Sequence, residues 1–322
     1  MPLPAIFHPS LDFESSALEI FQEQSGREGI YKKYIDTLEI NPSEIKTIQQ
    51  IPFLPIAFFK THEIKDPSRE TQQIFKSSGT TGMDVSKHFI ADTELYIKSF
   101  TTGFQQFYGD IKKVCFLALL PSYLERNDSS LVYMCSHLIN QSGHPSSGFY
   151  LNNLSDLSQQ LKALRDQHQP VILIGVSYAL LDLAASFPLD FPELIIIETG
   201  GMKGRREEMI REEVHALLKK SFNVKSIHSE YGMTELLSQA WSKGNGLFEC
   251  PPWMKILIRH INDPFQLVKE NQSGAINIID LANYYSCSFI ATDDIGRMKG
   301  SKFEVLGRLD NSDLRGCNLL VD

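Results

Sequence analysis

Four short segments of the chain contain residue types that could bind phosphate groups and a metal ion. The first is Ser77-Ser-Gly-Thr-Thr-Gly82, in which two glycines allow a close backbone approach and four hydroxyls can contact phosphate oxygens. No Gly-Lys-Ser/Thr follows at the required place, so the segment is not the phosphate loop of P-loop hydrolases. Taken alone, the pattern also fits an ordinary polar turn between a strand and a helix.

The second segment, Glu230-Tyr-Gly-Met-Thr-Glu235, follows residues 224–228, where we expect a short strand that closes a strand–helix alternation. Loops just past the carboxyl ends of parallel strands bind ligands in open α/β sheets. Tyr231 is suited to stacking, Thr234 to a phosphate contact and Glu235 to Mg²⁺ ligation. The alternative is structural: Tyr231 packs in the core, and Thr234 caps a following helix with Glu235 in its first turn.

The third and fourth segments lie near the end of the chain. Ala291-Thr-Asp-Asp-Ile-Gly296 places adjacent carboxylates after an apolar strand, and Asp294 could bind a metal or accept hydrogen bonds from ribose hydroxyls. Its alternative is a plain Asp-rich turn. Gly307-Arg-Leu-Asp310 contains Arg308, which could hold a phosphate bidentately. A surface pair of arginine and aspartate is the ordinary explanation of this fourth segment.

The periodicity of the apolar residues predicts the elements that must position these segments. Helices are expected at residues 15–24, 27–38, 92–108, 129–141, 154–167 and 205–220, and apolar strands at residues 113–120, 171–174, 194–197 and 224–228. This alternation is typical of a parallel sheet covered by helices on both faces. Shorter strands are expected at residues 253–259, 274–280 and 287–291, and an extended segment with two prolines at residues 51–60.

These elements predict an α/β fold with a small antiparallel part at its end. We expect an α/β core over residues 1–250, and an antiparallel β subdomain with a C-terminal tail over residues 251–322.

The composition excludes several classes of protein. The 322 residues include 31 basic and 39 acidic side chains, a net charge of −8, which argues against a dedicated nucleic-acid binder. With 42% hydrophobic and 22% charged residues, the chain is neither disordered nor fibrous. Its apolar runs are far shorter than the roughly 20 residues that span a bilayer, and it does not start with a secretory signal. The five cysteines form no C-x-x-C pair, which predicts reduced thiols and a cytoplasmic location.

Together and in this order, the four segments resemble the motifs of the adenylate-forming (acyl-CoA synthetase-like) superfamily, over about residues 50 to 317. Within that superfamily the strongest resemblance is to the acyl-protein synthetase family of bacterial bioluminescence operons. It depends on four runs of the sequence: IPFLPIAFFK from Ile51, ETGGMKGRREEM from Glu198, YGMTELLSQAW from Tyr231 and GRLDNSDLRGCNLL from Gly307.

The resemblance implies a large adenylate-forming domain, with an ATP crevice between its parallel and antiparallel parts. It implies that ATP and Mg²⁺ activate a fatty or aromatic carboxylic acid to an acyl-adenylate. The acyl group would then pass to a thiol of the protein itself, of a partner protein or of CoA. Neither a nucleic acid nor a membrane is an expected partner. The alternatives are a non-catalytic nucleotide- or acyl-binding module and an acyl-CoA ligase.

The resemblance also implies roles for single residues. The nucleotide-binding residues would be Ser77, Ser78, Gly79, Thr80, Thr81, Gly82, Gly200, Gly201, Tyr231, Asp294 and Arg308. Thr234 would contact the α-phosphate and Glu235 would ligate Mg²⁺, so both would be catalytic. Cys317, next to Gly316 near the C-terminus, would be the thiol that accepts the acyl group. Its alternative is a small buried hydrophobic residue.

Two features depart from the superfamily pattern. Gly82 is followed by Met-Asp-Val-Ser-Lys87 instead of Gly-x-Pro-Lys, so either Lys87 reaches in or the loop relies on hydroxyls and backbone donors. The chain ends soon after Asp310, so the mobile C-terminal domain of the larger enzymes, with its lysine, is expected to be absent. Of the other polar residues, His88 and His228 are expected to be packing histidines.

Overall fold

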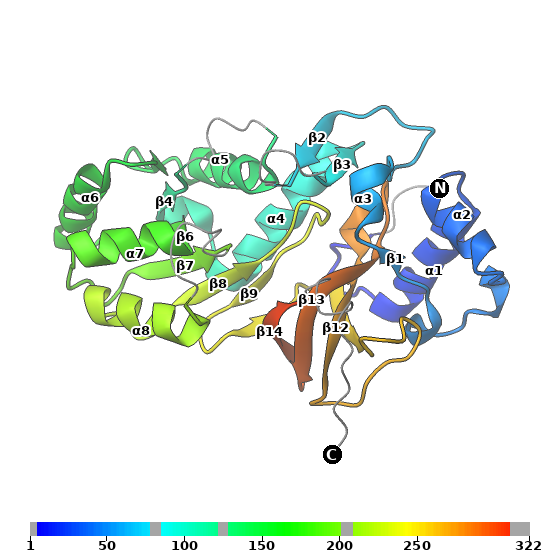
Figure 1. Ribbon diagram of the computed structural model, residues 1–322. Coiled ribbons are helices and arrows are strands. Elements are labelled where there is room, and N and C mark those ends of the chain that lie inside the picture. The colour runs from blue at the N-terminus through cyan, green and yellow to red at the C-terminus, as the bar shows by residue number, and fades with distance from the viewer. Residues whose placement is uncertain (1–4, 78–84, 122–127, 201–208, 310–322) are drawn as a thin grey trace, which may run out of the picture.

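One mixed sheet runs through the computed structural model, which describes residues 5–77, 85–121, 128–200 and 209–309 (Figure 1). Its strands lie side by side in the order β11 (Met254–Arg259), β12 (Ser273–Asp280), β13 (Phe289–Lys299), β14 (Lys302–Arg308), β10 (Leu247–Glu249), β9 (Ala240–Ser242), β8 (His228–Tyr231), β7 (Ile195–Thr199), β6 (Val171–Val176), β4 (Cys115–Leu119) and β5 (Gly148–Tyr150). Neighbours are parallel from β5 to β8 and antiparallel from β8 to β11. The predicted α/β fold and its antiparallel part are therefore confirmed.

Helices cover both faces of the parallel half of the sheet. These helices are α4 (Thr93–Tyr108), α5 (Ser130–Ser142), α6 (Leu154–Asp166), α7 (Ser177–Ser186) and α8 (Arg211–Phe222). On one face, Tyr108 of α4 stacks on His228. On the other face, His215 of α8 approaches Glu198. Because both faces are covered, β4 and β6 are buried throughout, which is why their sequences are continuously apolar.

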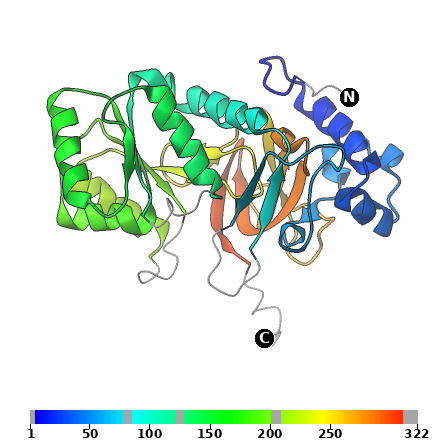
Figure 2. The same cartoon turned by 90° about the horizontal axis from the view of Figure 1, so that it is seen from above.

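Two N-terminal helices, α1 (Phe13–Gly26) and α2 (Ile30–Thr37), pack against the antiparallel half at the other end of the molecule (Figure 2). Phe21 of α1 meets Phe289 of β13 edge to face, with ring centroids 5.9 Å apart. The Gln24 side chain donates hydrogen bonds to the carbonyl oxygens of Asn283 and Tyr284. The helices predicted for this region are therefore confirmed, and they brace the loop that follows β12.

The segment predicted to be extended at residues 51–60 is extended only in its first half. There β1 (Leu54–Pro55) pairs with β13 in parallel. The second half forms the short helix α3 (Phe58–Thr61), which is possible because both prolines precede it. The described ranges also contain the 3-10 turns η1 (Pro42–Glu44), η2 (Ile48–Gln50), η3 (Ile111–Lys113) and η4 (Leu281–Asn283).

A separate hairpin of β2 (Gln73–Lys76) and β3 (Lys87–Ile90) brackets the hydroxyl-rich segment. The alternative of a turn between a strand and a helix is therefore wrong, because the segment joins two antiparallel strands. Alternate residues of the hairpin, Phe75, His88 and Ile90, are buried and fix it to the body of the protein.

Several predicted elements begin or end elsewhere. The helix predicted from residue 205 starts at Arg211, since Ile210 is extended, and residues 205–208 lie outside the described ranges. The strand predicted at residues 224–228 is β8, which starts at His228 and continues to Tyr231. Helix α7 and strand β14 were not predicted. None of the helices in the described ranges is long and apolar enough to cross a membrane. The domain boundary at residue 250 stays a prediction.

Candidate active site

Three residues from separate motifs meet where the parallel and antiparallel halves of the sheet join. Tyr231, the last residue of β8, donates a hydrogen bond of 2.7 Å from its hydroxyl to Asp294 Oδ2 on β13. Arg308 on β14 pairs in register with Asp294, and its Nε lies 3.9 Å from Asp294 Oδ1. The fold thus brings together three side chains that the sequence analysis assigned to one nucleotide site.

The Tyr231 ring packs in the core while its hydroxyl reaches the site. The ring lies edge to face against Phe248 and Phe303, with centroids 5.9 and 5.6 Å away. Burial, and then the charge of Asp294, raise the pKa of Tyr231 well above its ordinary value. The tyrosine therefore stays neutral and donates to the carboxylate. The interpretation in which Tyr231 packs in the core is therefore confirmed for its ring. Its contact with an adenine stays a prediction.

Asp294 lies within a strand, so the alternative of an Asp-rich turn is wrong. Its backbone N–H donates to Thr292 Oγ1 at 3.1 Å, and the Thr292 hydroxyl donates to the carbonyl of Ile276 at 2.8 Å. Burial raises the pKa of Asp294 above its ordinary value, and the Tyr231 hydroxyl and the Arg308 charge offset part of that rise. The strand therefore presents a fixed carboxylate that can accept further hydrogen bonds.

Glu235 is buried in the turn that follows β8, next to the same group. Residues 232–239 contain no helix, so the alternative in which Thr234 caps one is wrong. Burial raises the pKa of Glu235, whereas a hydrogen bond with Ser86 and the charge of Arg308 lower it. Glu235 therefore lies within electrostatic reach of Arg308, and beside the base of the β2–β3 hairpin.

Buried polar residues that the sequence analysis missed hold this turn in place. Asp280, at the end of β12, accepts hydrogen bonds from the backbone N–H of Leu237 at 2.9 Å and of Ser238 at 3.0 Å. It also accepts one from the Ser238 hydroxyl at 2.6 Å. Asn283 donates to the carbonyl oxygen of Glu235 at 2.8 Å. The only sequence signal was an acid at the end of an apolar strand.

His88 connects the hairpin to the turn. It is fully buried, and its two ring nitrogens lie 2.9 Å from the Thr234 carbonyl oxygen and 2.9 Å from Ser286 Oγ. A carbonyl oxygen can only accept, so Nδ1 carries the hydrogen and Nε2 accepts from the serine. Burial lowers the pKa of His88 to about 4, so this tautomer is neutral near pH 7. The prediction of a packing histidine is confirmed, and its partners tie β3 to Thr234.

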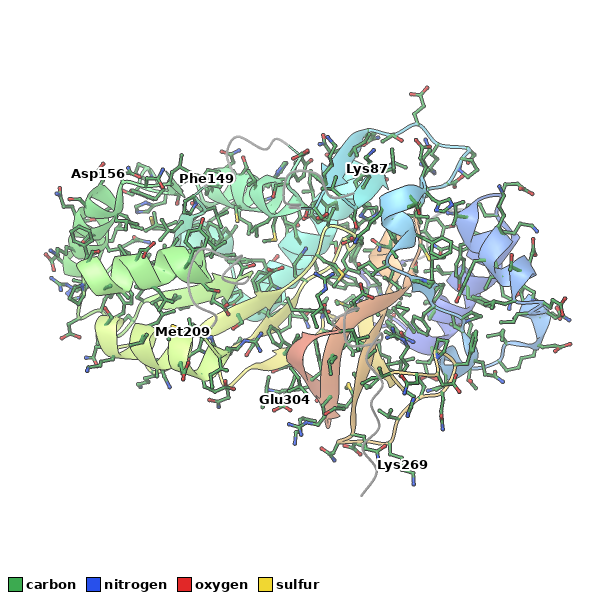
Figure 3. The ribbon with its side chains drawn as sticks, viewed as in Figure 1. Lys87, Phe149, Asp156, Met209, Lys269 and Glu304 are labelled. Atoms are coloured by element: carbon green, nitrogen blue, oxygen red, sulfur yellow. The ribbon has the colours of Figure 1, made fainter. Side chains whose placement is uncertain are left out.

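The first residue of the hydroxyl-rich segment closes the base of the hairpin. Ser77 donates its backbone N–H to the Ser86 carbonyl oxygen at 3.0 Å, and its Oγ accepts from the Ser86 N–H at 3.0 Å. Residues 78–84, which include the predicted Ser78, Gly79, Thr80, Thr81 and Gly82, lie outside the described ranges. Lys87, which Figure 3 labels, is exposed, and alternation along β3 directs it to the face opposite to the buried His88.

A family model described as acyl-protein synthetase, LuxE, matches residues 12–322. The chain belongs to this family. A curated relative, the long-chain-fatty-acid–luciferin-component ligase of Aliivibrio fischeri, is 24% identical over 331 residues, which cover 94% of this chain and 85% of the relative.

Solved structures of adenylate-forming enzymes share the fold of this chain. ATP-bound MatB from Rhodopseudomonas palustris aligns with a TM-score of 0.57 at 14% identity, covering 77% of this chain and 49% of MatB. The chain thus spans about half the length of MatB. A 2-hydroxyisobutyryl-CoA ligase in complex with 2-HIB-AMP and CoA aligns with a TM-score of 0.64 at 11% identity, covering 92% of this chain and 74% of the ligase. These likenesses confirm the predicted adenylate-forming fold.

In this acyl-protein synthetase family member, the glycine predicted for the adenine pocket directly follows β7. Gly200 has a φ of +66°, a left-handed conformation that favours glycine. Its carbonyl oxygen accepts a hydrogen bond of 2.8 Å from Ser177, whose hydroxyl also lies 2.6 Å from Glu198 Oε1. Gly201 lies outside the described residues. Glu198 begins the run ETGGMKGRREEM, but Ser177 belongs to no motif, and the sequence offered no signal for their contact.

The cysteines in the described ranges do not supply a reactive thiol. Cys115, Cys135 and Cys287 are buried, Cys250 is partly exposed, and all four are unpaired. Burial raises the pKa of each of them, for Cys287 to about 12, so their thiols stay protonated near pH 7. The predicted acceptor Cys317 lies outside the described residues.

The protein groups available to a metal are few. The described residues contain no group of three or more His, Cys, Asp or Glu side chains that could hold an ion by themselves. Mg²⁺ is commonly bound by one or two carboxylates together with substrate phosphates. The buried carboxyl of Glu235, which contacts Ser86 at the base of the β2–β3 hairpin, therefore fits a Mg²⁺ that is shared with a nucleotide.

Proposed function

We propose that the protein uses ATP to convert a fatty or aromatic carboxylic acid into its acyl-adenylate, and then transfers the acyl group to a thiol. The observation that carries this proposal is the convergence of Tyr231, Asp294, Arg308 and Glu235 at one junction of the sheet. The membership in the acyl-protein synthetase family and the adenylate-forming fold support it. The relative from Aliivibrio fischeri is a long-chain-fatty-acid ligase, which favours a fatty acid as substrate.

In the proposed complex, each side chain has a distinct task. The Asp294 carboxylate accepts hydrogen bonds from ribose hydroxyls, held at a fixed angle by Tyr231. Arg308, whose side chain is 70% exposed, is free to turn from Asp294 toward a phosphate. Thr234 contacts the α-phosphate. Ser77 and the hydroxyls after it contact the other phosphates, and Gly200 and Gly201 lie beside the adenine.

Glu235 would hold a Mg²⁺ ion together with phosphate oxygens. When bound, such an ion neutralises charge on the phosphates. The protein's own contribution is to keep the Glu235 carboxyl in place, which the hydrogen bond from Asn283 to the Glu235 carbonyl and the Ser86 contact provide.

The proposed reaction has two balanced steps. A carboxylate oxygen of the acid attacks the α-phosphorus of ATP, the bond to the β-phosphate oxygen breaks, and pyrophosphate leaves. A thiolate sulfur then attacks the acyl carbon, the bond to the phosphate oxygen breaks, and AMP leaves with that electron pair. The proton that the thiol loses goes to solvent.

The acceptor that we propose is Cys317, with a partner protein or CoA as the other possible sources of a thiol. The four cysteines of the described ranges are poor candidates because their pKa values are raised. With radiolabelled acid and ATP, we expect label on the denatured protein that neutral hydroxylamine releases. Cys317→Ser should lose that label and keep the adenylation step. Equal labelling of both proteins would exclude Cys317 as the acceptor.

Exchange of radiolabelled pyrophosphate into ATP, over a panel of acids, tests the activation step. We expect exchange that depends on one class of acid and on Mg²⁺, and a loss of about a hundredfold or more in Glu235→Gln, which removes the charge. Lys269→Gln, on the outer loop between β11 and β12, is a control that should keep the rate (Figure 3). An absence of acid-dependent exchange with every acid would contradict the proposal.

A further inference from the structure

A second buried acid, Glu230, lies next to the proposed nucleotide site and has no role in the reaction described above. It is in β8, one residue before Tyr231, and its Cα is paired in register with that of Thr199 on β7. The Thr199 hydroxyl donates a hydrogen bond of 2.6 Å to Glu230 Oε2. Thr199 is in turn the residue before Gly200, so one hydrogen bond joins the two segments that flank the proposed adenine contact.

The other oxygen of Glu230 lies over the start of the turn. A Cβ added to Gly232 would be 2.2 Å from Glu230 Oε1 and 3.4 Å from its Cδ, so the carboxyl occupies the space that a side chain there would need. Because Gly232 has no side chain, the Glu230 carboxyl can lie directly against the backbone there. One side chain thus contacts Thr199 on one side and Gly232 on the other.

We propose that Glu230 is a positioning residue of the nucleotide site, which sets the distance between the Thr199–Gly200 segment and the Tyr231–Gly232 segment. This inference rests on the proposed function, because it takes those two segments as the walls of the adenine contact. Alternation along β8 directs Glu230 toward the face that α4 covers, whereas Tyr231 points to the other face and meets Asp294. Glu230 therefore acts through its neighbours rather than by touching the nucleotide.

The surroundings make the charge of Glu230 sensitive to pH near neutrality. In the described ranges, the titratable groups that influence it or share its face are Glu198 on β7, His228 on its own strand, Tyr96 and Tyr108 on α4, and Cys135 on α5. Burial raises the pKa of Glu230 to about 7; the Thr199 hydrogen bond opposes this rise, and the Glu198 charge adds to it.

The neighbours themselves do not change charge near pH 7. Burial raises the pKa values of Tyr96, Tyr108 and Cys135, so these groups stay neutral. Burial also lowers the pKa of His228 to about 4. Burial would raise the pKa of Glu198, but His215 and the Ser177 hydroxyl lower it overall, so it stays ionised. Above pH 7, Glu230 thus adds a second buried negative charge beside an anionic nucleotide.

The test compares ATP binding in three variants of the full chain, measured both as the KM for ATP in pyrophosphate exchange and by titration calorimetry. Thr199→Val removes the donor and keeps the side-chain shape; we expect about tenfold weaker ATP binding with an unchanged KM for the acid. Thr199→Ser keeps the hydroxyl and should restore binding. Ser221→Ala is the control: it removes a partly buried hydroxyl that donates a hydrogen bond to the Ala184 carbonyl, away from the proposed site. This variant should bind ATP as the wild type does.

The pH profile of Glu230→Gln separates positioning from simple folding. The ratio of wild-type to variant ATP dissociation constants cancels the titration of ATP itself. We expect this ratio to be near one at pH 6 and to rise about fivefold by pH 8, because only the wild type ionises there.

Each outcome decides between the two claims. Normal ATP binding by Thr199→Val, or a change confined to the KM for the acid, would overturn the inference. If the wild type binds ATP in the calorimeter but shows no pyrophosphate exchange, the proposed function fails. The calorimetric ATP dissociation constants of the variants then still test the role of Glu230. If the wild type binds no ATP, both fail.

Discussion

At the scale of single residues, His88 shows how a neutral side chain can couple two loops of a site. Its Nδ1–H donates to the Thr234 carbonyl and its Nε2 accepts from Ser286, both at 2.9 Å. His88→Phe keeps the ring volume but removes the hydrogen bonds that His88 makes to the Thr234 carbonyl and the Ser286 hydroxyl, both of which belong to partly exposed residues. We expect it to lower the free energy of unfolding by about 1–3 kcal/mol, measured by urea titration, and to slow pyrophosphate exchange about tenfold.

Two further variants check that effect. His88→Asn, whose amide N–H takes roughly the place of Nδ1–H, should recover part of the exchange rate. His228→Phe makes the same change at a histidine that stacks on Tyr108 away from Thr234, and should leave the exchange rate largely unaffected. Wild-type exchange in His88→Phe would show that the bridge to Thr234 does not matter for the reaction.

Glu230 also makes a prediction about stability and pH. Burial raises its pKa from the ordinary 4.5 to about 7, so between these values the folded state holds a proton that the unfolded chain has released. The wild type therefore loses stability as pH rises from about 4.5 to 7, by about 3 kcal/mol from this group. Glu230→Gln has no carboxyl to titrate. Its free energy of unfolding, compared with that of the wild type, should therefore rise by about 3 kcal/mol between pH 5 and pH 8.

Urea unfolding of both proteins at pH 5, 6.5 and 8 measures the difference. Asp280, whose pKa burial raises to about 6, titrates in both proteins and cancels. A stability difference that does not vary with pH would mean that Glu230 is already ionised in the folded protein at pH 5.

At the scale of elements, the sequence predicts best the strands that are buried on both faces. The apolar runs of β4 and β6 indicated strands because no polar residue interrupts them. Strand β8 was placed too early because its own residues, His228, Ser229 and Glu230, are polar, so no apolar run marks it in the sequence. Helix α7 was missed because it is buried nearly all round and so lacks an amphipathic period.

The turn after β8 depends on the end of β12. The Asp280 carboxylate accepts from the backbone of Leu237 and Ser238, from the Ser238 hydroxyl and from the Ala282 N–H. Asp280→Asn places an N–H group against these donors. We expect it to lower the free energy of unfolding by about 2–3 kcal/mol and to reduce exchange, because the same turn contains Glu235. Asp263→Asn, which changes an exposed loop acid that accepts from Phe265, should change neither measurement.

At the scale of the whole molecule, the order of the motifs gave a prediction of which residues form the site, but not of how the described ones meet. Tyr231 and Asp294 lie far apart in the sequence, and only the continuous sheet, which joins β8 to β13 through β9, β10 and β14, brings them into contact. Hydrogen bonds such as that between Thr199 and Glu230 depend on strand register, which no motif encodes. The N-terminal helices contribute at a distance, since Gln24 braces the loop that contains Asn283 and Tyr284.

The central claim is that the acid attacks the α-phosphorus of ATP. Incubation of the protein with ATP, Mg²⁺ and the acid that supports exchange, labelled with ¹⁸O in its carboxylate, followed by mass spectrometry of the released nucleotide, tests it most directly. The account predicts AMP that carries one ¹⁸O atom, because the attacking carboxylate oxygen leaves with the phosphate when the acyl group is transferred. Unlabelled AMP, or label found in inorganic phosphate with ADP as the nucleotide, would contradict it.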